Sequence, residues 1–259
     1  MNKFIFSQKS VYNSRLRLYR YSDDYYRLVY LKSSRLRGFE EIKKNKIVKD
    51  NDEVDRCSLS RTKRNIREYA LCNDFYYFCT FTIADPQFRY DLDFCQSLLK
   101  KQFKKLKRKN SDLRYLFITE KHKDGAYHFH GLMSKIDDGF YVNKNNYLSN
   151  IYLDILGFNS FSVIKDKNKI SNYITKYITK DCVKNKHNQI YFCSRNLKKA
   201  DKFDIDLLKF NINDVDFSYC NDYVKIKDIK INEKNNEKLL TILTNSDIYI
   251  DSKGVDLYG

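Results

Sequence analysis

The sequence lacks the features that mark membrane and secreted proteins. It contains no apolar run of about 18 residues, and its first ten residues, MNKFIFSQKS, have no apolar signal-peptide core. Its seven cysteines form no CxxC pair and are odd in number, so they indicate neither a zinc ribbon nor a disulfide framework. We therefore expect a protein of the reducing cytoplasm that makes no membrane contact.

Motifs for nucleotide binding and serine hydrolysis are also missing. The sequence contains no GxGxxG, no GxxxxGK[ST] and no GxSxG. Phosphate-binding loops and nucleophile elbows need those glycines at that spacing. We therefore expect no nucleotide cofactor and no serine nucleophile of the hydrolase type.

What the sequence does have is an excess of positive charge. It contains 49 Lys and Arg residues against 33 Asp and Glu, a formal net charge of +16. This balance points to a polyanionic partner, either nucleic acid or an anionic membrane surface. Hydrophobic residues make up 42% and aromatic residues 15%, which indicates a globular chain and not a disordered one.

The pattern of apolar residues predicts an α+β fold with a mostly antiparallel sheet. Residues 75–83 form a continuous aromatic and β-branched run, which predicts a central strand buried on both faces. Residues 91–109 have apolar positions at helical spacing, an acidic start and a basic end. Further strands are expected in the tyrosine-rich early part and at 158–164, 190–194 and 248–250, and further helices at 60–72, 169–184 and 237–243.

Three potential metal ligands lie within residues 115–134, YLFITEKHKDGAYHFHGLMS. In a strand, His128 and His130 point to the same face because side chains alternate. If this stretch is a hairpin whose three-residue loop ends at Gly125, Glu120 falls opposite His128. Taken alone, an HxH triplet is more often a pair of ordinary surface or core histidines. Together with Glu120, however, it predicts a patch of two imidazoles and one carboxylate.

Such a ligand set suits a catalytic divalent ion. Two nitrogens and one oxygen leave coordination positions open, as catalytic sites require. We expect Mn²⁺ or Mg²⁺ as the cofactor. Bound to a phosphodiester, the ion would act as a Lewis acid on a non-bridging oxygen.

A tyrosine pair follows in residues 169–184, KISNYITKYITKDCVK. Helical spacing brings Tyr173 and Tyr177 to one face and Lys176 and Lys180 to a neighbouring one. Either tyrosine is a candidate nucleophile that would form a covalent phosphotyrosine, and either lysine would stabilise the phosphate charge. The alternative is that one tyrosine only packs or stacks on a base.

Two basic helices are candidate DNA-binding elements, with a solvated surface as the alternative for each. The residues concerned are Arg61, Lys63, Arg64 and Arg67 in the first, and Lys104, Lys105, Lys107 and Arg108 in the second.

Three motifs in this order resemble those of the HUH endonucleases that initiate rolling-circle replication. They are Phe-Cys-Thr-Phe-Thr at 78–82, Glu120 with His128-Phe129-His130, and Tyr-Ile-Thr-Lys-Tyr-Ile-Thr-Lys at 173–180. The resemblance covers roughly residues 60–200 and is closest to the replication-associated proteins of phages, plasmids and small single-stranded DNA viruses. Residues carried over onto the family's metal triad are Glu120, His128 and His130.

The resemblance implies a ferredoxin-like fold, with an antiparallel sheet of about five strands flanked by helices. It also implies a metal-dependent nick in single-stranded or hairpin origin DNA, a 5′-phosphotyrosine intermediate and a free 3′-hydroxyl that primes synthesis. Some members use two tyrosines four residues apart and others use one, so both Tyr173 and Tyr177 stay candidates. Because this chain has no P-loop, a host helicase would unwind the DNA for a host polymerase.

On this basis residues 57–204 are expected to form the endonuclease domain. Residues 1–56 would be a charged extension, and residues 205–259 a polar one that could pack on the same domain. A transposase or a relaxase remains an alternative within the same class, although relaxases usually have three histidines where this chain has Glu120. From another class, the alternative is a regulator that binds single-stranded nucleic acid without cleaving it.

Overall fold

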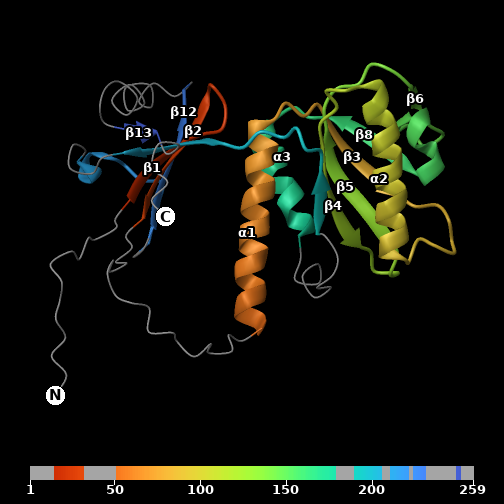
Figure 1. Ribbon diagram of the computed structural model, residues 1–259, viewed down its shortest axis with the longest axis horizontal. Coiled ribbons are helices and arrows are strands. Elements are labelled where there is room, and N and C mark those ends of the chain that lie inside the picture. The colour runs from red at the N-terminus through yellow and green to blue at the C-terminus, as the bar shows by residue number, and fades with distance from the viewer. Residues whose placement is uncertain are drawn as a thin grey trace. The chain divides into compact units, whose positions relative to one another are not determined.

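The computed structural model describes residues 15–31, 51–178, 190–205, 211–221, 224–231 and 249–251 (Figure 1). By their contacts the residues form two compact units. Val48–Lys199 make up one, here called the central unit; Met1–Ile47 and Ala200–Gly259 make up the other, the terminal unit. This division differs from the boundaries expected at 56/57 and 204/205, because strands from both ends of the chain share one sheet.

Seven antiparallel strands form the sheet of the central unit. They are β3 (Tyr77–Thr82), β4 (Tyr115–Lys121), β5 (Tyr127–Met133), β6 (Phe140–Val142), β7 (Leu148–Asn150), β8 (Asn159–Val163) and β9 (Tyr191–Cys193). The helices are α1 (Asn51–Cys72), α2 (Leu92–Lys109) and α3 (Lys167–Ile174), with the 3₁₀ helices η1 (Ile151–Leu156) and η2 (Thr175–Tyr177). The strand order is β6-β7-β8-β3-β5-β4-β9. Because α2 joins β3 to β4 and β5 lies between them, the sheet contains a split βαβ unit.

The two faces of this sheet carry separate apolar clusters. On one face, α2 packs Phe103 against Phe117 and Phe129. On the other face, α1, α3 and η2 cover Ile118 and Leu132, and Figure 1 shows α2 on one side of the sheet with α1 and α3 on the other. Burial of these side chains holds the helices at fixed positions on the sheet.

Strand β3 corrects one expectation. Residues 75–83 do contain a strand, but it is not buried on both faces: Cys79 and Phe81 are fully buried, whereas Thr80 and Thr82 are half-buried. The threonines lie on the face that also carries the two histidines of β5. That face is a polar site at this point, so it does not need the all-apolar burial of a core strand.

The other expected helices are found with different limits. The helix at 60–72 belongs to the longer α1, and the helix at 91–109 is α2, whose N-cap Asp91 accepts a hydrogen bond from the amide of Phe94. The helix expected at 169–184 ends as α3 at Ile174 and continues as η2 to Tyr177. Residues 179–189 and the helix expected at 237–243 lie outside the described residues.

A second antiparallel sheet forms the terminal unit. Its strands are β1 (Arg15–Arg20), β2 (Tyr25–Leu31), β10 (Asp201–Ile205), β11 (Tyr219–Cys220), β12 (Val224–Lys230) and β13 (Tyr249–Asp251). They lie in the order β11-β12-β2-β1-β10-β13 and bury Leu16, Leu18, Leu28, Ile205 and Ile229 on one face. The α+β class is thus confirmed, but the chain has two antiparallel sheets where one of about five strands was expected. Within the described residues, no helix combines the length and the apolar character needed to cross a membrane.

Candidate active site

The β4–β5 hairpin has the expected loop and register. Gly125 has a φ of 92°, and the His122 amide donates to the Ala126 carbonyl at 2.8 Å. Glu120 pairs with His128 across the two strands. The positive φ is accessible to glycine without steric cost, which explains why this residue ends the loop. One carboxylate and two imidazoles therefore share one face of the sheet.

Glu120 and His130 are in direct contact. The His130 Nε2 lies 2.7 Å from the Glu120 Oε2, with the His130 side chain 11% exposed and that of Glu120 35% exposed. Burial lowers the pKa of His130, and the hydrogen bond to Glu120 opposes that effect. Since a carboxylate only accepts, the proton in this hydrogen bond belongs to Nε2 of the imidazole.

Two threonines of β3 hold the other side of the imidazoles. Thr80 pairs with His130 across the strands, and its hydroxyl lies 3.2 Å from Nδ1 of that histidine; Thr82 and His128 repeat the arrangement at 3.2 Å. Each hydroxyl fixes the rotation of its ring and leaves Nε2 turned away from it. This is the arrangement by which neighbouring groups orient metal-binding histidines in other proteins. The TxT pattern at 80–82 is visible in the sequence, but only its pairing with HxH reveals the role.

A further histidine lies beside His128. The His122 ring stacks on the His128 ring at a centroid distance of 4.8 Å, and His122 contacts Asp124 at 3.4 Å. Arg89 also binds Asp124, at 3.0 Å. Burial and the neighbouring His122 both lower the pKa of His128. The lowered pKa favours the neutral imidazole, which is the form that binds a metal. The sequence pattern had placed His122 only in the hairpin.

The three expected metal ligands fit a divalent ion by their chemistry. They offer one carboxylate and two imidazole Nε2 atoms whose Nδ1 atoms already have partners. In the described part of the chain, no three His, Cys, Asp or Glu side chains gather into a group that could hold a metal ion. Glu120 and His130 are together, whereas the His128 ring lies against His122.

The tyrosine pair lies directly on this patch. The Tyr177 ring stacks on the His130 ring at a centroid distance of 3.9 Å and an angle of 14°, and its hydroxyl donates to the Tyr173 hydroxyl at 2.8 Å. Burial of Ile174 and Ile178 against the sheet fixes this segment in place. Burial raises the pKa of Tyr177, and so does the hydrogen bond to Tyr173. Tyr177 therefore stays protonated and donates, while the Tyr173 side chain, 42% exposed, presents its oxygen to solvent.

Of the two expected lysines, one is described. The Lys176 Nζ lies over the Tyr173 ring, 5.4 Å from its centroid. Lys180 lies outside the described residues. A cation is thus present next to the more exposed of the two tyrosines.

The two basic helices stand on opposite faces of the sheet. α1 packs with α3 and η2 on the face that carries Glu120, whereas α2 covers the other face. In α1, Arg61 and Arg64 are exposed and Lys63 and Arg67 are half-buried; in α2, Lys104, Lys105 and Arg108 are exposed and Lys107 is half-buried. The fold brings only the first set to the side of the tyrosines.

Comparisons with known proteins identify one similarity. Residues 76–182 match the family model of the replication-associated protein ORF2 and its relatives. The matched segment begins just before β3, contains the β4–β5 hairpin and ends beyond η2. Searches of curated proteins and of solved structures returned no match.

Proposed function

We propose that this chain is a replication initiator of the HUH endonuclease type that nicks single-stranded or hairpin origin DNA and later rejoins the ends. The match of residues 76–182 to replication-associated proteins supports an initiator role. The observation that carries the nicking chemistry is the stack of Tyr177 on His130, together with its hydroxyl contact to Tyr173. A candidate nucleophile thereby lies on the candidate metal ligands, although more than 40 residues separate them in the chain.

The nucleophile in this proposal is a tyrosine hydroxyl. The phenolic oxygen loses its proton and attacks phosphorus, the P–O3′ bond breaks, and the departing 3′ oxygen takes a proton to become a free hydroxyl. The 5′ phosphate stays esterified to tyrosine, which conserves the bond energy for rejoining. Tyr173 is the better first nucleophile, because it is exposed and the hydrogen bond from Tyr177 stabilises its phenolate.

Glu120, His128 and His130 would hold the divalent ion, Mn²⁺ or Mg²⁺. When bound, the ion supplies Lewis-acid activation of the scissile phosphate. Thr80 and Thr82 orient the imidazoles, and Lys176 offers positive charge beside Tyr173. The free 3′-hydroxyl would prime a host polymerase, with a host helicase opening the duplex.

The direct test is covalent capture. The wild-type protein is incubated with a pool of single-stranded oligonucleotides and Mn²⁺, and the products are separated on a denaturing gel. We expect a protein–DNA adduct that disappears with EDTA and in a Tyr173→Phe/Tyr177→Phe double variant. Tyr147→Phe is the matched control, because Tyr147 is an exposed tyrosine outside the site. DNA binding without any adduct would instead identify a non-enzymatic regulator.

The single variants decide how many tyrosines react. If Tyr173→Phe loses all adduct and Tyr177→Phe loses none, only Tyr173 is a nucleophile; partial loss in both indicates alternating use. His128→Ala should abolish the adduct while DNA binding persists, because the basic residues remain. An undiminished adduct from His128→Ala would contradict the metal ligand set.

A further inference from the structure

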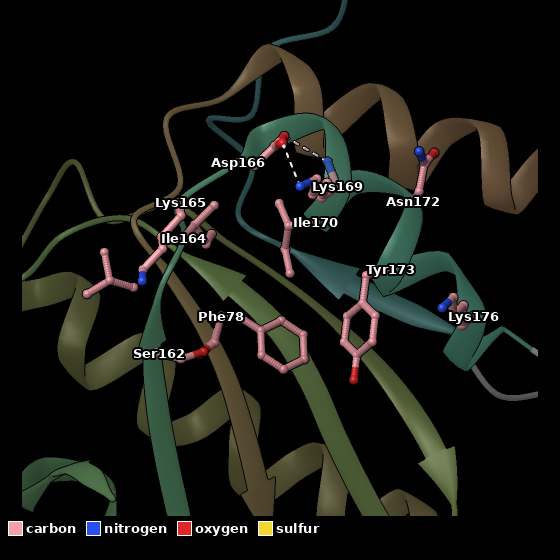
Figure 2. Close-up of a pocket in the computed structure, with 11 residues that line it drawn as sticks. Phe78, Ser162, Ile164, Lys165, Asp166, Lys169, Ile170, Asn172, Tyr173 and Lys176 are labelled. Carbon is pink, nitrogen blue, oxygen red and sulfur yellow. Dashed lines mark hydrogen bonds and ion pairs between the residues drawn. The ribbon is translucent and has the colours of Figure 1, made fainter.

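A cavity opens beside the tyrosine pair, between the end of β8 and α3. Its volume is about 800 Å³, within the range of sites that enclose small organic ligands. Figure 2 shows Phe78 and Tyr173 side by side at one end of this α3 pocket, with Ile164 and Ile170 beside them. One of its walls is therefore the candidate nucleophile itself.

The lining of the α3 pocket suits the faces of a nucleobase. Phe78, Ile164 and Ile170 are half-buried apolar side chains, and the Phe78 ring packs edge-on against Tyr173 at 5.5 Å. Bases stack on aromatic rings whatever their sequence, because every base has a π face. An aromatic ring flanked by aliphatic side chains thus provides a stacking surface.

Polar groups at the same cavity suit the edge of a base. Asn172 is exposed and carries an amide that both donates and accepts, and Ser162 contributes a hydroxyl. Hydrogen bonds of this kind distinguish one base edge from another. The α3 pocket therefore offers both stacking and a means of selection.

The charge around the α3 pocket suits a phosphate backbone. Lys165, Lys169 and Lys176 are exposed lining residues. The single acidic residue of the lining, Asp166, accepts hydrogen bonds from the amides of Asn168 and Lys169, so it caps α3. The charge balance favours an anionic ligand that also has an apolar ring.

We propose that the α3 pocket binds the base of the nucleotide next to the scissile phosphate and so sets the sequence preference of nicking. The inference rests on the proposed function and extends it to a specificity site. Because Tyr173 lines the pocket and also accepts the hydrogen bond from Tyr177, a base held there has its phosphate beside the reacting hydroxyl. Asn172 and Ser162 are the specificity-determining residues.

The binding test needs neither cleavage nor a known origin. The probe is a short oligothymidylate with one 2-aminopurine, whose fluorescence falls when it stacks, measured in EDTA. Ser162→Trp fills the pocket and should weaken binding about tenfold, the loss of one stacked base. Ser97→Trp is the matched control, because Ser97 is exposed on α2 across the sheet. Equal affinity and equal quenching in Ser162→Trp and the wild type would overturn the pocket.

A second measurement separates the pocket from the nicking chemistry. Adducts formed with a random single-stranded pool and Mn²⁺ are sequenced around the nick for the wild type, Asn172→Ala and the exposed control Asn145→Ala. We expect Asn172→Ala to relax the preference at one position next to the nick. Adducts with an unchanged preference would overturn the specificity role but leave the nicking proposal intact. No wild-type adduct, with quenching still lost in Ser162→Trp, would contradict nicking and the pocket's place beside a scissile phosphate.

Discussion

At the scale of single residues, the two threonines of β3 tie the metal proposal to the fold. A hydroxyl both donates and accepts, so Thr80 can bond Nδ1 of His130 whichever nitrogen carries the proton. With Nε2 given to an ion, the proton lies on Nδ1 and the threonine accepts it. The same holds for Thr82 and His128. Each threonine is thus a positioning residue for a ligand.

Replacing both threonines with valine should weaken metal binding. Thr80→Val/Thr82→Val keeps the side-chain shape and removes the hydroxyls, and loss of such partners typically costs about 10-fold to 100-fold in metal affinity. Calorimetric titration with Mn²⁺ measures this without any DNA. Thr119→Val is the control, since its hydroxyl bonds Gln96 on the opposite face of the sheet. Unchanged Mn²⁺ affinity in the double variant would rule out the orienting role.

At the scale of elements, the sheet separates the two basic helices. α1 shares the face of Glu120 and the tyrosines, and α2 lies across the sheet. DNA whose scissile phosphate lies at the tyrosines is therefore closer to the arginines of α1. The sequence predicts both helices as DNA-binding elements, because charge and spacing do not reveal which face of the sheet a helix covers.

Charge removal on the two helices should have unequal effects. Arg61→Ala/Arg64→Ala should weaken binding of single-stranded DNA and reduce the slope of log affinity against log salt by about 1.4, the value for two lost phosphate contacts. Lys104→Ala/Lys105→Ala, which removes the same charge from exposed positions of α2, should change that slope much less. Titrations at several salt concentrations measure both. Equal changes would show that the DNA also follows α2.

At the scale of the whole molecule, the terminal unit is one sheet made from both ends of the chain. β1 pairs with β2 and β10, and β2 pairs with β12. Ion pairs join these strands, Arg17 with Asp204 and Arg27 with Asp228, each at 2.6 Å. The described site residues all belong to the central unit. The two ends therefore depend on each other for folding more than the site depends on either.

Truncation should reveal this dependence. A chain without residues 1–47 loses β1 and β2, which exposes Ile205 and Ile229 and leaves β10 and β12 as open edges that aggregate readily. A fragment of residues 48–199 lacks the whole terminal unit and should stay soluble and form the adduct. Size-exclusion chromatography and the covalent-capture gel measure the two properties. A soluble chain lacking only residues 1–47 would contradict the shared-sheet account.

The sequence alone determined the local parts of this protein. Strand alternation and a glycine-ended loop predicted the hairpin and its register, because both depend only on neighbouring residues. Helical spacing predicted α2, and the order of three motifs singled out Glu120, His128, His130 and the tyrosines as one candidate site.

Only the tertiary structure decided what depends on contacts between distant residues. These include the stack of Tyr177 on His130, the pairing of Thr80 and Thr82 with the histidines, and the separation of α1 from α2 by the sheet. The shared sheet of the two ends belongs here too. Local patterns carry no record of which face a helix covers or which strand lies alongside, because packing of the whole chain settles both.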